Sequence, residues 1–288
     1  MRQTLIAIVV GLFVAPVSPG QAQWVEPPGT GWVELQLSHQ DTDRRFNHLG
    51  ETEPLFNEEA RSITTTIRLS GALGLWRGLD VWVDAPYHRL AFNDVVQDRR
   101  STGLGDPRVF LRMGPSLFGL NDLPLSFALR GGVKFPVGDF PIDPDIVPLT
   151  EGQRDWEVLV EVGKSLHPWP VYVMGWAGYR WREENTQIQR RPGDERLLYV
   201  AAGGSFEFLH WKIAVDGLLG RPPVRTDFGL VLENNRRELV QLLPTLGGAL
   251  GPGIVEIGAR LPLHGRNLPA GPSVTLGYFL TWDQPVWK

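Results

Sequence analysis

The residues that could carry catalysis or hold a metal ion are few, and their spacing suits neither task. The chain has no Cys, which excludes thiolate nucleophiles, thiolate metal sites and disulfides. None of the six His is followed two residues later by Ser, the pair that a barrel phospholipase would need. Asp139, Asp143 and Asp145 lie close together, but two Pro interrupt them and their spacing matches no calcium loop. We therefore predict no enzyme, no metal site and no cofactor.

The charged residues follow another pattern, in which they alternate with apolar residues along short segments. In the segment 79–85, Asp80 and Asp84 take alternate places with Leu79, Val81 and Val83. Alternation with a period of two is typical of a β-strand that has one polar and one apolar face. The pattern recurs in about twelve segments of roughly 8 to 12 residues along the chain, so the sequence predicts an all-β protein.

The connections between these segments alternate in character. Short joints at 75–78, 167–170 and 251–253 are rich in Gly, Pro or Trp, whereas the loops 41–59 and 88–102 are long and charged. Transmembrane barrels of the outer-membrane type have this asymmetry, with short periplasmic turns and long external loops. The predicted fold is therefore a transmembrane antiparallel up-and-down β-barrel of about 12 strands; a soluble β-sandwich or propeller is the alternative.

The first residues resemble an export signal. Arg2 gives a positive start, residues 5–14 form an apolar run too short to span a bilayer as a helix, and small residues precede a predicted cut before Gln23. We predict a cleaved signal peptide over 1–22 and one barrel domain over 23–288, with an uncleaved anchor as the alternative. The predicted location is the outer membrane of a Gram-negative bacterium, where the partners would be membrane lipid and the barrel assembly machinery.

The polar face of each strand should line the barrel interior, because a Lys or Arg facing lipid near the midplane costs about 2 to 4 kcal/mol. Both signs of charge occur in nearly equal number, which favours pairing across adjacent strands over strong ion selectivity. These side chains either line a solute path or only brace the wall. The residues predicted to face the lumen are Glu34, Arg68, Asp80, Trp82, Asp84, Arg108, Phe110, Arg112, Arg130, Lys134, Glu157, Glu161, Arg180, Lys212, Asp216, Glu256 and Arg260.

An ordered set of short motifs resembles the outer-membrane transporter family of the MetA pathway of phenol degradation. The set consists of Gly103-Leu104-Gly105-Asp106 after Asp84-Ala85-Pro86-Tyr87, then 132–139, Asp155-Trp156-Glu157 and Gly178-Tyr179-Arg180. The resemblance implies an outer-membrane channel for hydrophobic or aromatic compounds. Gly103, Gly105 and Asp106 would form a loop–strand junction in which the glycines permit a tight entry and Asp106 accepts hydrogen bonds from backbone amides; a turn that never meets solute is the alternative.

Two functions remain open on this basis. The first is a channel for passive uptake of small solutes, hydrophobic or aromatic ones among them, with no nucleic-acid partner because the net charge is only -4. The second is a non-conducting barrel that serves as a structural or adhesive surface protein.

Overall fold

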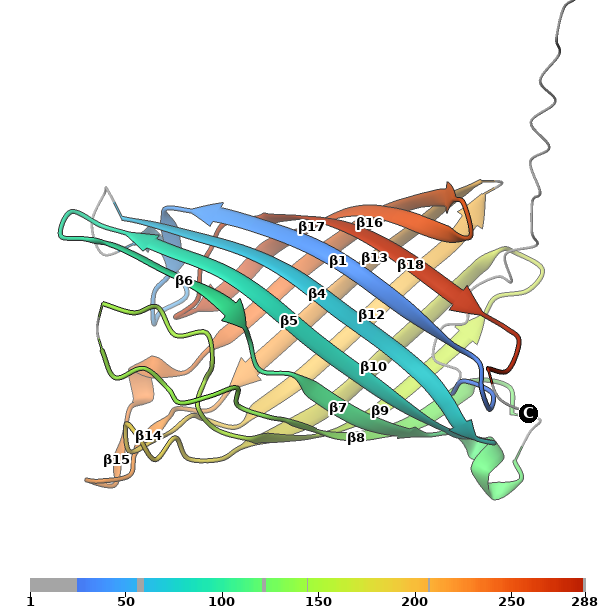
Figure 1. Ribbon diagram of the computed structural model, residues 1–288, viewed down its shortest axis with the longest axis horizontal. Coiled ribbons are helices and arrows are strands. Elements are labelled where there is room, and N and C mark those ends of the chain that lie inside the picture. Colours follow the sequence, from blue (N-terminus) through green and yellow to red (C-terminus); the bar gives the residue numbers. More distant parts are fainter. Residues whose placement is uncertain (1–24, 56–59, 121–122, 144, 207, 287–288) are drawn as a thin grey trace, which may run out of the picture.

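The computed structural model describes residues 25–55, 60–120, 123–143, 145–206 and 208–286 (Figure 1). The predicted signal peptide lies outside the described residues. One antiparallel sheet of thirteen strands curls on itself and closes where β1 (Gly31–Thr42) pairs with β18 (Ser273–Trp282). Strands β6 (Asp98–Leu104) and β7 (Arg108–Met113) share one position beside β5 (Leu79–Asn93), so the wall has twelve strands, which confirms the predicted fold class.

The wall follows the chain order, and each strand pairs with the next except that β6 and β7 both pair with β5. Its strands are β1 (Gly31–Thr42), β4 (Arg61–Trp76), β5 (Leu79–Asn93), β6 (Asp98–Leu104), β7 (Arg108–Met113), β8 (Ser126–Lys134), β9 (Asp155–Ser165), β10 (Val171–Arg182), β12 (Glu195–Phe206), β13 (Leu209–Gly220), β16 (Glu238–Leu250), β17 (Gly253–Arg266) and β18 (Ser273–Trp282).

The remaining elements are short and lie in the connections. They are β2 (Arg44–Phe46), β3 (Thr52–Pro54), β11 (Arg190–Arg191), β14 (Val224–Arg225), β15 (Leu230–Val231) and the 3-10 helices η1 (Pro115–Phe118) and η2 (Glu233–Asn235). The pair β2–β3 and the three strands β11, β14 and β15 form two small sheets at the long-loop end. No helix in the described part of the chain is long and apolar enough to cross a membrane.

The segment 88–102, which the sequence predicts to be a loop, is mostly strand. β5 continues to Asn93, turns, and pairs with β6 from Asp98 onward. The error arises because this hairpin extends beyond the rest of the wall (Figure 1), so neither of its faces has to be apolar. Between β6 and β7 the three residues 105–107 lie opposite two residues of β5, a one-residue bulge that interrupts the wall strand.

The two faces of the wall differ in accessibility. On β9, Val158 is 41% exposed and Leu159 2%, and the neighbouring Glu157 and Glu161 are 4% and 1% exposed. This alternation continues around the barrel, where Leu35, Leu69, Leu111, Val200, Ile213 and Leu276 are exposed on the outer face. The outer face is therefore apolar, as a lipid-facing surface requires.

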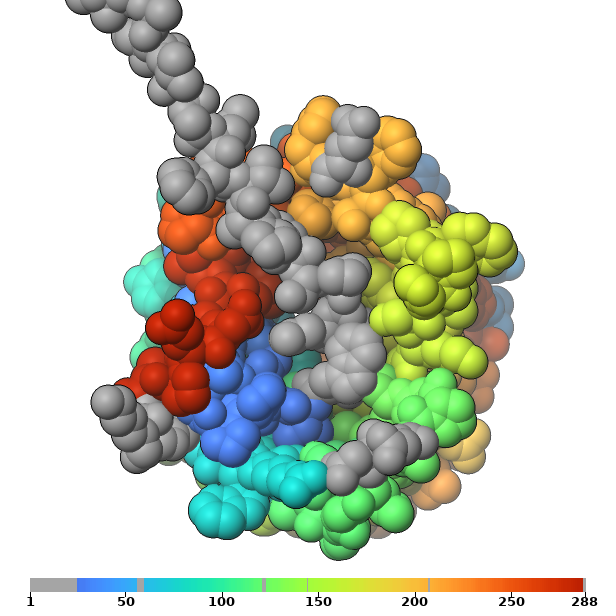
Figure 2. All heavy atoms as spheres, turned by 90° about the vertical axis from the view of Figure 1, so that its right-hand side faces the viewer, coloured from blue at the N-terminus to red at the C-terminus, as the bar shows by residue number. Residues whose placement is uncertain are grey.

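Aromatic side chains lie on this outer surface near both ends of the strands. Trp76, Trp169 and Phe206 are exposed at the end that carries the short turns, and Tyr87 and Trp156 are exposed toward the long loops. Figure 2 looks at the short-turn end, where the start of β1 lies between the β4–β5 turn and the end of β18. Two aromatic rims at opposite ends are typical of a barrel that spans a bilayer.

Candidate functional site: the barrel interior

The charged residues predicted to face the lumen contact one another across strands that are not hydrogen-bonded neighbours. Arg112 on β7 lies 3.5 Å from Glu161 on β9, and Lys212 on β13 lies 3.6 Å from Glu256 on β17. A strand stands between the partners in each pair. Only side chains on the concave face of a curved wall can meet in this way, so these groups project into the interior.

A tightly packed ion-pair cluster lies near the short-turn end. The guanidinium of Arg112 holds the carboxylate of Asp80, directly opposite on β5, with Nη2–Oδ2 at 2.7 Å and Nε–Oδ1 at 3.2 Å. Glu161 is shared between Arg112 and Arg130, whose Nε lies 2.9 Å from Oε1. All four side chains are almost inaccessible, so the two acids and two bases neutralise each other inside the wall.

Aromatic rings surround the guanidinium of Arg130. Its Cζ lies 4.6 Å from the ring centre of Trp82, 5.1 Å from that of Phe110 and 5.7 Å from that of Trp176. Phe110 can lie flat on the wall because residue 132, opposite it on β8, is Gly; a Cβ there would come within 2.1 Å of the ring. With Leu159 and Leu197 these rings form the apolar core of the interior, where a desolvated cation gains from the faces of the rings.

A second ion-pair cluster joins the wall to the external loops. Lys134 Nζ contacts Asp155 at 2.9 Å and Glu151 at 2.5 Å, and Arg182 reaches both Glu151 and Glu195. Further ion pairs link Arg180 to Glu157 at 2.8 Å and Arg180 to Glu195 at 2.5 Å. Arg237, from the β13–β16 loop, closes the cluster by binding Glu151 at 3.0 Å and Glu195 at 2.5 Å.

Glu151 is the loop residue that this cluster holds most firmly. Burial alone would raise the pKa of its carboxyl, but Arg182, Arg237 and Lys134 outweigh burial and bring the pKa well below its ordinary value. The carboxylate therefore stays ionised and fixes the β8–β9 loop to the wall.

The glycine–aspartate motif lies beside the same loop. Asp106 accepts hydrogen bonds from the backbone amides of Val137 at 3.1 Å and Glu151 at 2.9 Å. At Gly105, an added Cβ would come within 2.4 Å of the His88 ring. At Gly103 it would lie 2.9 Å from Leu149. The motif thus lets the bulge pack tightly and anchors both ends of the β8–β9 loop.

The opposite part of the inner wall is loosely packed. Its ion pairs are longer or more accessible: Arg68–Asp84 is 2.9 Å with Arg68 32% exposed, and Lys212–Glu256 is 3.6 Å with the two side chains 31% and 29% exposed. Glu34, Asp216 and Arg260 bind the amide side chains of Gln36 and Gln241 rather than opposite charges. Arg108, at the border of the two parts, lies 3.7 Å from Glu157 and is 30% exposed.

A cavity of about 80 Å³ lies between these loosely paired side chains. Gln36, Lys212, Glu256 and Arg260 supply its polar lining, and Tyr199 supplies a ring. The ring of Tyr199 stacks on Trp176 with centres 5.4 Å apart, and Trp32 contacts both Trp82 and Phe279. The interior therefore offers half-buried aromatic faces and hydrated charges side by side.

The chain segment before β1 folds into the short-turn mouth. The amide of Glu26 donates to Asp80 Oδ2 at 2.9 Å, and Glu26 itself is buried. Gly29 and Thr30 exchange backbone hydrogen bonds with Gly74 of β4. Burial raises the pKa of the Glu26 carboxyl to about 7, with Asp80 adding to the effect and Arg112 opposing it. This segment thus covers the ion-pair cluster of Asp80 and Arg112.

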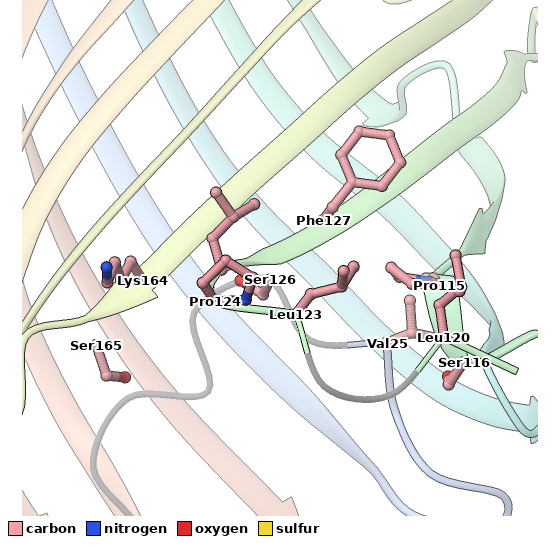
Figure 3. A pocket seen from close by; sticks show the side chains of 12 residues that line it. Val25, Pro115, Ser116, Leu120, Leu123, Pro124, Ser126, Phe127, Lys164 and Ser165 are labelled. Atoms are coloured by element: carbon pink, nitrogen blue, oxygen red, sulfur yellow. The ribbon is translucent and has the colours of Figure 1, made fainter.

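A larger hollow of about 350 Å³ lies outside this interior, at the rim of the short-turn end. Side chains from the β7–β8 turn, the end of β9 and Val25 line it (Figure 3). Its lining combines apolar residues such as Leu120 and Phe127 with Ser116 and Ser126, and Lys164 is the one charged member among the described residues. None of the lumen residues predicted from the sequence borders it.

Sequence reasoning missed several interior groups. Strand periodicity predicts three of them. Asp155 and Arg182 lie two residues from Glu157 and Arg180 on the same faces of their strands, and Glu195 lies directly opposite Arg180. Strand parity also marks four aromatic residues as inward-facing, because they alternate in step with the inward charges: Trp32, Trp176, Tyr199 and Phe279. Glu26, Glu151 and Arg237 come from segments outside the strands, and no periodic pattern marks them. Asp139, Asp143 and Asp145 join no cluster, and in the described part of the chain no three His, Asp or Glu could hold a metal ion.

Fold and interior together define a twelve-stranded transmembrane antiparallel β-barrel. Neither a protein-family model nor a curated protein matches the chain. The COG4313 outer membrane channel from Pseudomonas putida F1 has a similar structure, with a TM-score of 0.74 at 15% identity over 92% of this chain and 100% of that one. At that identity the likeness shows the shared fold.

Two other barrels are less similar. The CymD monoaromatic hydrocarbon channel gives a TM-score of 0.45 at 8% identity over 90% of each chain. The β domain of the Bordetella autotransporter BrkA gives 0.47 at 12% identity over 88% of this chain and 100% of that one.

Proposed function

We propose that the protein is an outer-membrane channel through which small solutes pass down their gradient. The observation that carries the proposal is the accessibility of Arg68, Arg108, Lys212 and Glu256, which lie inside a closed wall and yet are 29% to 32% exposed. These side chains therefore border space within the barrel that water can occupy. The passage would run between these side chains, which come from β4, β7, β13 and β17, away from the packed clusters.

The proposed solutes are small and partly hydrophobic or aromatic. Half-buried rings of Trp32, Trp176, Tyr199 and Phe279 face the interior, and ring faces of this kind stack on flat apolar solutes. The neighbouring charges would keep the path hydrated. This choice of solute agrees with the resemblance found in the sequence motifs.

Location and biogenesis belong to the same proposal. The apolar outer face and the two aromatic rims suit the outer membrane, reached after export with a cleaved signal peptide and insertion by the barrel assembly machinery. The chain continues beyond β18. In the described part of this extension, Val286 donates a backbone hydrogen bond to Gly29 at 3.0 Å, so it folds against the segment that precedes β1.

Single-channel conductance in planar bilayers tests the channel. The native protein should give discrete steps. Asp84→Asn removes the anionic partner of Arg68 and should shift the ion preference toward anions, whereas Lys212→Gln removes the partner of Glu256 and should shift it toward cations. Shifts in opposite directions are expected only if both side chains border the conducting path.

The matched control is Val200→Ala, which changes the exposed outer face and should leave conductance and ion preference unchanged. Correctly folded barrels that give no steps would favour the rival function, a non-conducting structural or adhesive barrel closed by its ion pairs.

A further inference from the structure

Two pairs of arginines lie on the outer face where the strands leave the predicted apolar band. On the β5–β6 hairpin, Arg89 is opposite Thr102 and Arg100 is opposite Ala91, so the two arginines are diagonal neighbours on one face. On β12 and β13, Arg196 is opposite Leu219, and Arg221 follows two residues later, with its amide bonded to Asp194 O at 2.8 Å. The second pair therefore has the same diagonal arrangement, with Cβ atoms about 7 to 8 Å apart.

Both pairs lie about equally far along their strands from the short-turn end. Arg89 is ten residues from Leu79 at the short-turn end of β5, and Arg196 is ten residues from Phe206 at that end of β12. Ten residues of a strand that rises ~3.3 Å per residue and tilts by about 40° span roughly 25 Å along the barrel axis. This is the height of the apolar band of an outer-membrane barrel, about 25 Å. The four guanidiniums thus stand level with the lipid headgroups on the long-loop side.

These arginines lack the carboxylate partners that other outer arginines have. Arg61 binds Asp41 at 2.6 Å, Arg225 binds Asp227 at 2.5 Å and Arg45 binds Glu53 at 2.8 Å. Among the residues that the structure describes, no carboxylate oxygen lies within 4.0 Å of the guanidinium nitrogens of Arg89, Arg100, Arg196 or Arg221. Like charges on diagonal positions repel unless an anion lies between them.

The nearest acidic residues along the strands are otherwise engaged or further out. Asp194 accepts hydrogen bonds from Tyr179 Oη at 3.1 Å and from the amide of Arg182 at 3.0 Å. Asp98 is exposed two residues beyond Arg100, on the side away from the apolar band.

A tyrosine lies beside each pair. Tyr87 precedes Arg89 by two residues on the same face and is exposed. Tyr179 is directly opposite Arg196, and the guanidinium of Arg221 lies 5.8 Å from its ring centre. An amphipathic ring at the headgroup level beside two guanidiniums offers an apolar contact for an acyl chain and a charged contact above it.

We propose that each arginine pair binds a phosphate group of an outer-leaflet lipid. Guanidinium groups bind phosphate oxygens bidentately, and a phosphate shared by two of them neutralises the repulsion within a pair. The two pairs would fix lipid at two separate places on the circumference. The proposal rests on the outer-membrane location proposed above and goes beyond the channel activity.

Native mass spectrometry of the purified full-length barrel in detergent tests this binding, with diphosphorylated lipid A as the probe. The variants are Arg89→Gln/Arg100→Gln, Arg196→Gln/Arg221→Gln and all four together. The matched control is Arg61→Gln/Arg225→Gln, which removes the same charge from two arginines that have carboxylate partners. Each double variant should lose one bound lipid, and the fourfold variant should bind at least tenfold more weakly than the native and control proteins. Heat-modifiable migration on gels checks that every variant is folded.

Two further arms identify the source of the phosphate. Dephosphorylated lipid A should bind the native barrel no better than the fourfold variant binds the phosphorylated form, and millimolar inorganic phosphate should not displace the lipid. Native-like binding by the folded fourfold variant, equal binding of the dephosphorylated lipid, or displacement by inorganic phosphate would overturn the proposal. Lipid binding is measured without conductance, so a silent channel that keeps its lipid refutes only the proposed function.

Discussion

At the scale of single residues, interior charges divide into those that are sealed and those that water reaches. Asp80 and Arg112 are almost wholly buried and bound in two places, whereas Lys212 and Glu256 are a third exposed and 3.6 Å apart. Burying an ion pair costs desolvation free energy. Removing one partner alone is strongly destabilising, because the other charge is then left buried and uncompensated. The sealed pairs should therefore govern stability and the accessible ones conduction.

Arg112→Gln should lower the free energy of unfolding by about 3 to 5 kcal/mol, because it leaves Asp80 and Glu161 short of a cation inside the wall. Urea-induced unfolding of the barrel in lipid vesicles measures this. Asp80→Asn combined with Arg112→Gln should cost less than the two single changes added together, since the double variant leaves fewer uncompensated charges. Arg61→Gln, which breaks an exposed pair, is the control and should have little effect. Equal effects for the buried and the exposed arginine would contradict the assignment.

At the scale of elements, the segment before β1 is held by contacts of a different kind from those in the wall. It has only a few backbone hydrogen bonds to β4, and the buried Glu26 carboxyl faces Asp80, Arg112, Thr30 and Asp283. Gly74 makes room for it, because a Cβ at that position would come within 1.9 Å of the Pro27 carbonyl oxygen. We therefore expect the segment to detach more readily than a wall strand.

Attachment of this segment should weaken as the pH rises. The pKa of Glu26 is about 7 when the segment is attached and ordinarily 4.5, so the attached form favours the protonated carboxyl. Ionisation of Glu26 adds a free-energy penalty to attachment. This penalty is absent below about pH 4.5, grows between pH 4.5 and about pH 7, and is complete above that range. It amounts to at most about 3 kcal/mol, and less where water reaches the carboxylate.

Hydrogen exchange of residues 25–30, corrected for the intrinsic rates, measures this effect at pH 5 and pH 8. The native protein should be less protected at the higher pH, and Glu26→Gln should remove the difference. Glu233→Gln, in an exposed loop, is the matched control and should keep the native pH dependence. Equal protection at both pH values in the native protein would show that Glu26 does not control attachment.

At the scale of the whole molecule, one apolar surface surrounds the barrel between two aromatic rims. Val160 lies at the centre of β9 on this surface and is 43% exposed. Its neighbours Leu159 and Glu161 are buried inside. A single strand thus separates hydrocarbon from a charged interior by the thickness of the sheet.

Val160→Arg should cost about 2 to 4 kcal/mol of folding free energy in a bilayer, because the guanidinium would lie near the midplane. Val160→Leu keeps the surface apolar and should be close to neutral. Folding titrations into lipid vesicles compare the two. An arginine tolerated as well as leucine would mean that this face does not meet hydrocarbon.

The sequence predicted the wall better than the connections. Apolar residues such as Val158 alternate with charged residues such as Glu157 because one face of β9 must be apolar. This requirement produces a period-two pattern that is visible in the sequence. The β5–β6 hairpin around Arg89 was predicted to be a loop because beyond the membrane no face has to be apolar. Glu151, Glu26 and Arg237 carry no periodic signal, since loops place their residues by tertiary contacts alone.

What the sequence by itself determined is the kind of fold: alternation, strand length and the asymmetry of the connections specify a closed barrel in a membrane, because lipid imposes a period-two pattern on every strand. Only the tertiary structure decided which charges meet. Curvature brings Arg112 to Glu161 and Lys212 to Glu256 across an intervening strand, and loop packing brings Glu151 to Arg182. These contacts depend on the radius of the barrel and the register of its strands, quantities that no local pattern encodes.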